Sequence, residues 1–338
     1  MLKGKKILIT GGTGSLGQAL TKRLLNSEVD TVRIFSRNEG KQIEMESKFD
    51  DGRLRFFVGD VRDLSRLIKA VEDADIVFHA AALKHVPKIE YNPFEAIKTN
   101  VIGSQNVIDA CLHENVERVI CIGTDKAVSP LNTYGATKLL MEKLFVSANN
   151  VLNREKHITK FIALRYGNVL GSSGSVIPKF VEQIKNKIKI TITDSNMTRF
   201  SITMNEAIDF ILNATKIGKG SEIFIPKLKA YSIQSVKETL FELLENTGEE
   251  LIGLRPGEKI QETLINADEL RYTWEFNDMY MIINPFYQLF NEKSIYDTYS
   301  NIKKIEKTQA YSSDNVDKIT NEELKALIET LGLLKNNY

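Results

Sequence analysis

Residues 5–17, KKILITGGTGSLG, run from an apolar segment straight into a glycine-rich loop. Lys5–Thr10 has the composition of a buried strand, and Gln18–Leu25 continues with helical periodicity. In a unit of this kind the glycines allow a tight turn and a close approach of the backbone to a pyrophosphate at the helix N-terminus. The stretch therefore predicts a dinucleotide site whose loop contacts come from Gly11, Thr13, Gly14, Ser15, Leu16 and Gly17.

Further apolar segments follow this unit and alternate with helical patterns. The expected strands are Thr31–Phe35, Leu54–Val58, Asp75–His79, Val119–Ile122 and Phe161–Tyr166. Strands that alternate with helices along the chain form a parallel sheet that is covered on both faces. We therefore expect a Rossmann-type, doubly wound α/β domain in residues 1–170.

Beyond about Gly171 the elements become shorter and mixed. The patterns predict helices at Val176–Lys185, Asn205–Lys216 and Ile233–Leu244, and strands at Ile188–Thr193 and Glu222–Ile225. We expect residues 171–338 to form a smaller, mixed α/β substrate-binding part, with segments that can cross between the two parts.

The end of the chain predicts a docking helix. Thr320-x-x-Glu323 is a capping box, and Ile319 and Leu324 are placed as a hydrophobic staple. An apolar stripe then runs to the stop at Gly332 and consists of Leu324, Leu327, Ile328 and Leu331.

The composition excludes several classes of protein. The chain has 338 residues, 42% of them hydrophobic and 26% charged, and a net charge of +1, which favours neither a nucleic acid nor a membrane as partner. No apolar run is long enough to span a bilayer, and the one after the basic N-terminus is too short for a signal peptide. The two cysteines fit buried positions, which favours a reducing, cytoplasmic setting. The four histidines lack paired ligand spacing, so we expect no metal.

The ends of the other strands add cofactor contacts. The second strand ends at Ser36-Arg37, where an NAD-binding protein carries an acidic residue for the ribose hydroxyls. An arginine there can pair with a 2′-phosphate, so we favour NADP; the alternative is a solvated arginine beside Glu39. Asp60 and Val61 are placed to meet the adenine, and small residues leave room for the cofactor at Ala80, Ala81 and Ala82.

Most of the expected chemistry lies in residues 119–138, VICIGTDKAVSPLNTYGATK. Thr124-Asp125-Lys126 emerge at the carboxyl end of a strand, where open α/β sheets place their ligands. Tyr134 and Lys138 lie one helical turn apart, and an ammonium there favours the phenolate of a tyrosine whose ordinary pKa is about 10. The alternative is a chance Tyr-x-x-x-Lys on an amphipathic helix.

The sequence alone leaves two possible roles open for Asn100 and for each of two arginines. Asn100 sits in mid-helix, where asparagine is a poor helix former, and either bonds backbone near the site or is exposed. Arg199 and Arg255 lie in loop contexts, and each either holds a diphosphate bidentately or forms a surface salt bridge.

Together these motifs resemble the extended short-chain dehydrogenase/reductase family that modifies nucleotide sugars, over nearly the whole chain. The residues that carry the resemblance are TGGTGSLG at 10–17, Asp60, the Tyr134 and Lys138 pair, and RYGNV at 165–169. Sugar-nucleotide 4,6-dehydratases of the family carry Thr-Asp-Glu where this chain has Thr124-Asp125-Lys126. That lysine, with FSRNEGKQ, HAAALKHVP, YNPFEAIKTN, MTRF and GLRPGEK, is similar to the inverting UDP-N-acetylglucosamine 4,6-dehydratases of pseudaminic acid biosynthesis.

The resemblance implies a role for each residue of the site. Tyr134 would take the C4 hydroxyl proton as hydride leaves for NADP⁺, Lys126 would remove the C5 proton, and Asp125 would protonate the departing C6 hydroxyl. For Lys126 to be neutral, burial and the positive charges of Lys138 and the oxidised nicotinamide would have to lower its pKa from about 10.4. The alternative is that Lys126 merely pairs with Asp125.

The resemblance also implies the remaining contacts. Further cofactor contacts are expected from Asn38, Lys41, Lys84, Asn100, Tyr134, Lys138 and Val169. UDP-N-acetylglucosamine is expected to meet Lys84, His85, Thr124, Asn168, Ser173, Ser175, Val176, Lys179, Thr191, Arg199, Arg255 and Glu258. The family further implies a homo-oligomer, either a dimer or a hexamer.

Other functions stay open. A related capsule-forming group has Met-Gly-x-Ser-Lys where this chain has an intact Tyr134. A configuration-retaining UDP-HexNAc 4,6-dehydratase and a UDP-sugar 4-epimerase share Tyr-x-x-x-Lys, but the epimerase needs no Asp-Lys pair. A non-catalytic, NADP-sensing protein of the same fold usually lacks the tyrosine.

Overall fold

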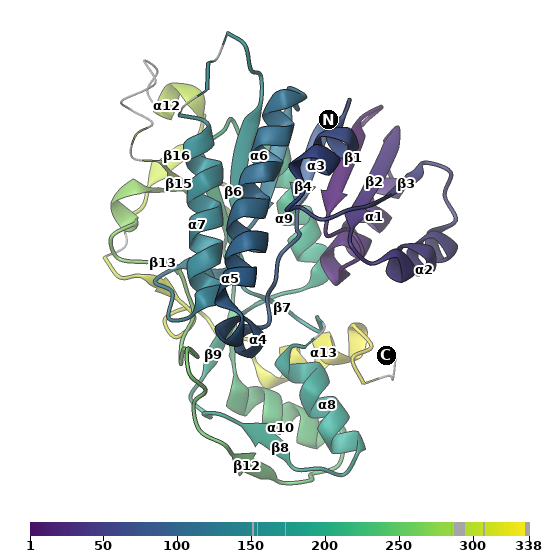
Figure 1. Ribbon diagram of the computed structural model, residues 1–338. Coiled ribbons are helices and arrows are strands. Elements are labelled where there is room, and N and C mark those ends of the chain that lie inside the picture. Colours follow the sequence, from purple (N-terminus) through teal and green to yellow (C-terminus); the bar gives the residue numbers. More distant parts are fainter. Residues whose placement is uncertain are drawn as a thin grey trace.

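The computed structural model describes residues 1–334 apart from 151, 154, 173, 285, 287–294 and 307. A large sheet with helices on its faces forms the upper part of the view in Figure 1, and a smaller region around α8, α10 and α13 lies below it. Within these residues no helix combines the length and the apolar character that crossing a bilayer requires.

The N-terminal part of the chain forms six parallel strands in the order β3-β2-β1-β4-β5-β6. The residues of β1, β4, β5 and β6 are almost all buried, as expected for a parallel sheet covered by helices on both faces, whereas β3 at the edge of the sheet is only partly buried. The strands are β1 (Lys6–Thr10), β2 (Thr31–Ser36), β3 (Leu54–Val58), β4 (Ile76–His79), β5 (Arg118–Ile122) and β6 (Lys160–Leu164). The predicted doubly wound fold is therefore confirmed.

The helical segments between these strands follow the expected alternation. They are α1 (Ser15–Leu25), α2 (Glu39–Phe49), α3 (Leu64–Val71), α4 (Val86–Tyr91), α5 (Pro93–Ala96), the π-helical η1 (Ile97–Ile102), α6 (Gly103–His113), the short 3₁₀ turn η2 (Asp125–Ala127) and α7 (Thr133–Ala148).

The strand register brings the carboxyl ends together. Thr10 pairs with both Phe35 and His79, His79 pairs with Cys121, and Ile122 pairs with Leu164. The residues that follow these strands therefore share one edge of the sheet, which is where α/β sheets bind ligands.

Several later segments return to the large sheet. β10 (Glu222–Pro226) pairs in parallel with β6, and the sheet continues through antiparallel β15 (Met279–Ile283), β14 (Thr273–Phe276) and β16 (Ile302–Lys304). α9 (Met204–Ile217) packs beside α1. Segments beyond residue 170 thus belong to the large sheet as well. The predicted boundary between 1–170 and 171–338 therefore marks only the place where the chain first leaves this sheet for the smaller region.

The smaller region has its own core. The side chains of α8 (Val176–Lys185), α10 (Ile233–Leu243) and α13 (Asn321–Thr330) meet there and include Ile177, Phe180, Val236, Leu240, Leu324 and Ile328. The short strands outside the large sheet are β7 (Asn168–Val169), β8 (Ile190–Ile192), β9 (Thr198–Ile202), β11 (Ala230–Ser232), β12 (Glu249–Leu251), β13 (Thr263–Ile265) and β17 (Tyr311–Ser312). The turn η3 (Leu270–Tyr272) and the helix α12 (Ile295–Thr298) complete the elements.

α13 has the features that the sequence predicts. Thr320 and Glu323 form the capping box, the helix ends with Leu331 as its C-cap, and Gly332 has φ +64°. Leu324 and Ile328 are buried in the core shared with α10. The docking helix is therefore confirmed.

A buried arginine ties the large sheet to later segments of the chain. Arg165 follows β6, is fully buried, and donates from Nε and Nη2 to both oxygens of Glu142, each at 2.6 Å. It also donates from Nη1 and Nη2 to Glu269, at 2.9 and 2.7 Å, and from Nη1 to the Leu264 carbonyl at 3.1 Å. Both carboxylates are thus held bidentately, which fixes α7 against β6.

Candidate active site

The first of two depressions at this sheet edge is the glycine groove, which follows β1, β2 and β3. It has a volume of about 370 Å³ and is lined by Gly11, Thr13, Gly14, Phe35, Ser36, Arg37, Asn38, Lys41, Gly59, Asp60, Val61, Ala81, Ala82 and Thr99. The structure therefore brings together most of the loop and strand-end residues that the sequence predicts for the cofactor.

Two glycines make the groove possible. Gly11 has φ +69°, and a Cβ there would lie 2.8 Å from the Ala81 backbone. A Cβ on Gly17 would lie 2.4 Å from the Gly12 carbonyl oxygen, so only glycine lets α1 start this close to the loop. Among the described residues no side chain caps α1 at Gly14, which lines the groove, so the first N–H groups of the helix have no side-chain acceptor, as an anion site requires.

Arg37 lies at the mouth of the groove. Its side chain is 55% exposed, and its Nη1 is 3.8 Å from Asp60 Oδ2. Asp60 is bound more closely by Arg62, at 2.7 Å, so the guanidinium of Arg37 remains largely available to a ligand. Asn38 caps α2 by accepting a hydrogen bond from the Lys41 backbone N–H at 2.9 Å.

Asn100 lies in η1 and is fully buried, so the exposed alternative is wrong. Its Oδ1 accepts from Leu83 N at 2.8 Å, and its Nδ2 donates to Leu83 O and to Thr137 Oγ1, each at 3.0 Å. The predicted bond to backbone near the site is confirmed. Its amide is committed to the loop after β4, whereas its direct contact with the cofactor stays a prediction.

The second depression is the charged cleft, between the sheet edge and the smaller region. It has a volume of about 330 Å³. Its lining includes Lys84, His85, Lys126, Asn132, Asn168, Ser175, Val176, Lys179, Thr191, Arg199, Arg255, Glu258, Lys259 and Glu262. All the described residues predicted to contact the substrate except Thr124 are in this lining, while Ser173 lies outside the described residues.

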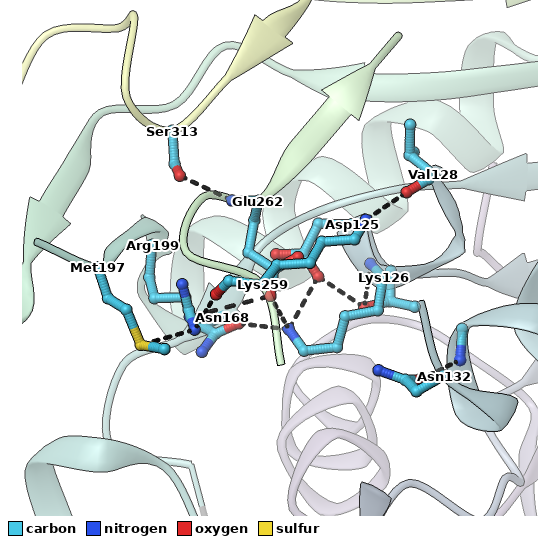
Figure 2. Close-up of polar contacts among 12 residues, drawn as sticks. Asp125, Lys126, Val128, Asn132, Asn168, Met197, Arg199, Lys259, Glu262 and Ser313 are labelled. Carbon is cyan, nitrogen blue, oxygen red and sulfur yellow. Dashed lines mark hydrogen bonds and ion pairs between the residues drawn. The ribbon is translucent and has the colours of Figure 1, made fainter. Parts of the chain in front are cut away.

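Lys126 is the centre of the charged cleft. It lies in η2, shortly after the end of β5 at Ile122. The N–H of Asp125 donates to the carbonyl of Tyr166, just beyond the end of β6, and this bond holds η2 at the sheet edge. Its Nζ donates to Asp125 Oδ1 and Asn168 Oδ1, each at 3.1 Å, and lies 3.2 Å from Glu262 Oε1 (Figure 2). An ammonium has three protons to donate, so these acceptors match it.

The expectation that the pKa of Lys126 is lowered is wrong for this arrangement. Burial does lower the pKa of the ammonium, but the carboxylates of Asp125 and Glu262 outweigh burial and raise it above the ordinary value. Arg199 opposes them more weakly. The lysine therefore rests here as a cation, and it must hand a proton to a neighbour before it can act as a base.

Each carboxylate beside Lys126 has one buried oxygen that accepts no hydrogen bond from the described residues. Asp125 Oδ1 accepts from Thr124 Oγ1 at 2.9 Å and from Lys126, whereas Asp125 Oδ2 and Glu262 Oε2 have no hydrogen-bond partner within the part of the chain that the structure describes. Unpaired buried carboxylate oxygens are costly, so each of these two oxygens is an acceptor that still lacks a donor.

Tyr134 and Lys138 lie on the buried face of α7, as predicted, but without the expected electrostatics. Burial raises the pKa of Tyr134 to about 12, although Lys126 opposes this shift. Lys138 Nζ donates to the Ile122 carbonyl at 2.6 Å instead of turning to the phenol. Burial lowers the pKa of Lys138 to about 8.

The two predicted arginines have different environments. Arg199 is 9% exposed at its side chain and donates to the carbonyls of Thr198, Lys259 and Ile260 at 2.7 to 2.9 Å. Its remaining donors face Met197 Sδ at 3.3 Å and Glu262 Oε1 at 3.8 Å, so a guanidinium with five donors is fully engaged. Arg255 is exposed at the cleft.

The loop that carries Arg255 is held against the start of α7. Asn132 accepts from Gly135 N–H as the cap of α7, and its Nδ2 donates to the Gly257 carbonyl at 2.8 Å. Lys259 Nζ donates to the Val128 carbonyl at 2.5 Å (Figure 2). The loop therefore closes one side of the cleft, close to Tyr134.

The sequence did not predict the roles of Glu262 and Lys259, nor the ion pairs of Arg165 with Glu142 and Glu269. Each makes its contacts with residues far away in the chain, so no local spacing reveals them. The one available signal for Glu262 was its place in a charged stretch shortly after Arg255 and Glu258.

Comparisons with known proteins agree with this geometry. Residues 7–284 match the model of a family described as polysaccharide biosynthesis protein. A UDP-N-acetylglucosamine 4,6-dehydratase (inverting) of Campylobacter jejuni (strain 81-176) is 46% identical over 93% of this chain and 94% of its own length.

Two further relatives extend the comparison. The X-ray structure of Pen from Bacillus thuringiensis is 42% identical, covers 99% of both chains and superposes with a TM-score of 0.90. A UDP-glucose 4-epimerase of Rickettsia massiliae is 39% identical over 98% of this chain and 97% of its own length.

Proposed function

The chain belongs to the polysaccharide biosynthesis protein family, and from this premise we propose that it is an inverting UDP-N-acetylglucosamine 4,6-dehydratase, a hydro-lyase. The product would be UDP-2-acetamido-2,6-dideoxy-β-L-arabino-hex-4-ulose, used for pseudaminic acid or a related surface glycan. The observation that carries the proposal is the hydrogen-bonded pair of Asp125 and Lys126 at the sheet edge, which elimination of water needs and C4 epimerisation does not.

The glycine groove would hold a nicotinamide dinucleotide. Its backbone fits one because the positive φ of Gly11 and the uncapped start of α1 allow a pyrophosphate to approach. When bound, this cofactor accepts a hydride and later returns it, so that it ends the reaction unchanged. The exposed Arg37 beside the groove, in place of an acidic residue, favours NADP over NAD.

Tyr134 would take the proton of the C4 hydroxyl. Because burial raises its pKa to about 12, the phenol needs help from a cation when it ionises. Lys126 already favours the phenolate, and Lys138, whose pKa of about 8 keeps it readily charged near neutral pH, lies one helical turn away.

Lys126 and Asp125 would supply both the base and the acid of the elimination. If the proton of Lys126 moves to Asp125, the N–H bond breaks, the electron pair stays on nitrogen, and an O–H bond forms on the carboxyl. One transfer along an existing 3.1 Å hydrogen bond thus gives a neutral amine for the C5 proton and a carboxylic acid for the C6 hydroxyl. Because Asp125 and Glu262 raise the pKa of Lys126, this transfer is unfavourable in the arrangement described here, and the lysine becomes a base only when bound substrate and cofactor offset those carboxylates.

The charged cleft would hold the UDP-sugar. Lys179 donates to Thr191 Oγ1 at 2.6 Å. Burial and the nearby positive charge of Arg255 lower the pKa of Lys179, so a bound anion would stabilise both cations. We assign the diphosphate to Lys179 and Arg255 and the sugar to the Asn168 side. Arg199, whose donors are engaged, would order the cleft wall.

A UDP-sugar 4-epimerase is the second candidate, because relatives that carry that name are 39% identical over nearly the whole chain. A retaining dehydratase would share the Asp125 acid but protonate C5 from the other face. A non-catalytic NADP-sensing role is disfavoured by the intact Tyr134 and Lys138. A cytoplasmic location and a homo-oligomeric state stay predictions.

The test is an NMR analysis of the product formed from UDP-N-acetylglucosamine by protein loaded with NADP⁺. We expect a C6 methyl group, a keto group or its hydrate at C4, and inverted configuration at C5. A C4 epimer that retains oxygen on C6 would overturn the proposal in favour of the epimerase, and retained configuration at C5 would identify the retaining dehydratase.

A further inference from the structure

Glu262 is a buried carboxylate with no role in the reaction described above. Its side chain is 3% exposed, and its Oε1 lies 3.2 Å from Lys126 Nζ and 3.8 Å from Arg199 Nε. In Figure 2 it lies beside Lys126, together with Asp125 and Asn168. A carboxylate buried at this point is expensive unless it is paired, so its cation contacts are needed to keep it there.

The backbone around Glu262 is fixed from two sides. Glu262 N–H donates to Ser313 Oγ at 2.9 Å, and Ser313 N–H donates back to the Glu262 carbonyl at 2.8 Å. On the other side, the guanidinium of Arg199 binds the carbonyls of Lys259 and Ile260, at 2.9 Å each. The carboxylate is thus presented to Lys126 by a rigid frame that includes the C-terminal segment.

The charges that face Lys126 come from several elements. Asp125 and Glu262 are the facing carboxylates in the described part of the chain, Arg199 and Lys259 are the facing cations, and the phenols of Tyr134 and Tyr231 complete the surroundings. When the proposed proton transfer makes Asp125 neutral, Glu262 is the carboxylate that remains ionised beside Lys126, still paired with Arg199.

We propose that Glu262 is a positioning residue for Lys126, holding its Nζ between Asp125 and Asn168 and keeping an anion beside it throughout the reaction. This inference rests on the proposed function. The proton shift from Lys126 to Asp125 leaves the total charge of Lys126, Asp125, Glu262 and Arg199 unchanged. When Lys126 later takes the C5 proton and is an ammonium again, Glu262 and Asn168 hold it in place.

The first test is Glu262→Gln, which keeps the shape but removes the charge. Cofactor reduction on addition of UDP-N-acetylglucosamine should stay near the wild-type level, since Tyr134 serves that step. Deuterium uptake at C5 from D₂O should fall roughly 10²-fold, the cost of a misplaced reacting group. The alkaline limb of the kcat profile, where Lys126 loses its proton to solvent, should move to lower pH by about 1 unit or more.

Glu275→Gln is the matched control. Glu275 lies on β14, where its carboxylate is 3.6 Å from Lys227, and it is outside both depressions described above. It should change neither the C5 exchange nor the pH profile. The proposal is wrong if Glu262→Gln leaves the C5 exchange and the pH profile at their wild-type values. It is also wrong if the variant loses cofactor reduction and C5 exchange equally and melts at a lower temperature, because Glu262 is then only a structural residue.

The second test needs no substrate. In protein labelled with ¹⁵N-lysine, the Lys126 signal is assigned from its absence in Lys126→Met, and its pKa is followed by NMR in wild type and in Glu262→Gln. The proposal requires a lower pKa in the variant, and an unchanged pKa would overturn it. Failure of the wild type to reduce its cofactor with UDP-N-acetylglucosamine would instead overturn the proposed function.

Discussion

The glycine groove and the charged cleft share one sheet edge but are built in opposite ways. The groove is made largely of backbone: glycines, an uncapped helix start and the ends of the first four strands, all within residues 11–99. The cleft is made of side-chain charges that meet from η2, β9 and the loop before β13, and Ser313 near the C-terminus holds the backbone of Glu262. The groove should therefore respond to changes of shape, and the cleft to changes of single charges.

The largest effect is expected for Tyr134→Phe, on the cleft side. The change removes the phenolic oxygen that takes the C4 proton but little volume, so the rate should fall by about 10² to 10⁴. No reduced cofactor should appear by absorbance when substrate is added. Tyr91→Phe, at a side chain that is 87% exposed, is the control. Normal cofactor reduction in Tyr134→Phe would mean that another group takes this proton.

Arg165→Met tests how much the buried ion pairs of Arg165, which hold α7 against β6 beside the cleft, contribute to the free energy of unfolding. The substitution leaves Glu142, which is fully buried, without its partner and weakens the hold on Glu269, so unfolding free energy should drop by about 3 to 5 kcal/mol. Arg23→Met, which breaks a partly exposed pair with Asp209, should cost at most about 1 kcal/mol. Urea denaturation measures both, and equal losses would contradict the distinction.

Arg37→Ala tests the one charged contact that we assign to the groove. Loss of a charge-assisted contact to a 2′-phosphate should weaken NADP⁺ binding by about 1.5 to 3 kcal/mol and leave NAD⁺ binding nearly unchanged. Titration with both cofactors measures the preference. If the wild type binds them equally, Arg37 is a solvated surface charge.

The smallest effects come from two glycines with nearly the same backbone conformation. Gly4 has φ +68° and Gly11 has φ +69°, but a Cβ meets nothing within 4 Å at Gly4 and lies 2.8 Å from the Ala81 backbone at Gly11. Gly4→Ala should cost only the strain of the left-handed region, about 1 to 2 kcal/mol. Gly11→Ala should cost more and also weaken cofactor binding; equal melting temperatures and affinities would show that the groove tolerates a side chain.

The same contrast explains what the sequence could predict. The strands around the groove and the capped helix α13 follow from local patterns, and the structure confirms them, while the cofactor contacts of the glycines stay a prediction. The strand ends also correctly placed Asp125 and Lys126. The lowered pKa expected for Lys126 is not found, because the carboxylates of Asp125 and, more weakly, of Glu262 outweigh burial, and the contact with Glu262 joins segments that lie far apart in the chain. The return of β10 to the large sheet was missed for a similar reason, since strand order is set by long-range pairing.

The central claim is that Lys126 removes the C5 proton while Asp125 protonates the departing C6 oxygen, before a proton is added to C5 from the opposite face. The direct test compares wild type and Lys126→Ala, both loaded with NADP⁺, with UDP-N-acetylglucosamine in D₂O. The wild type should place deuterium at C5 of a 4-keto-6-deoxy product with inverted configuration, and Lys126→Ala should reduce its cofactor but take up deuterium about 10² to 10⁴ times more slowly. Full dehydration by Lys126→Ala, or a wild-type product without deuterium at C5, would contradict the account.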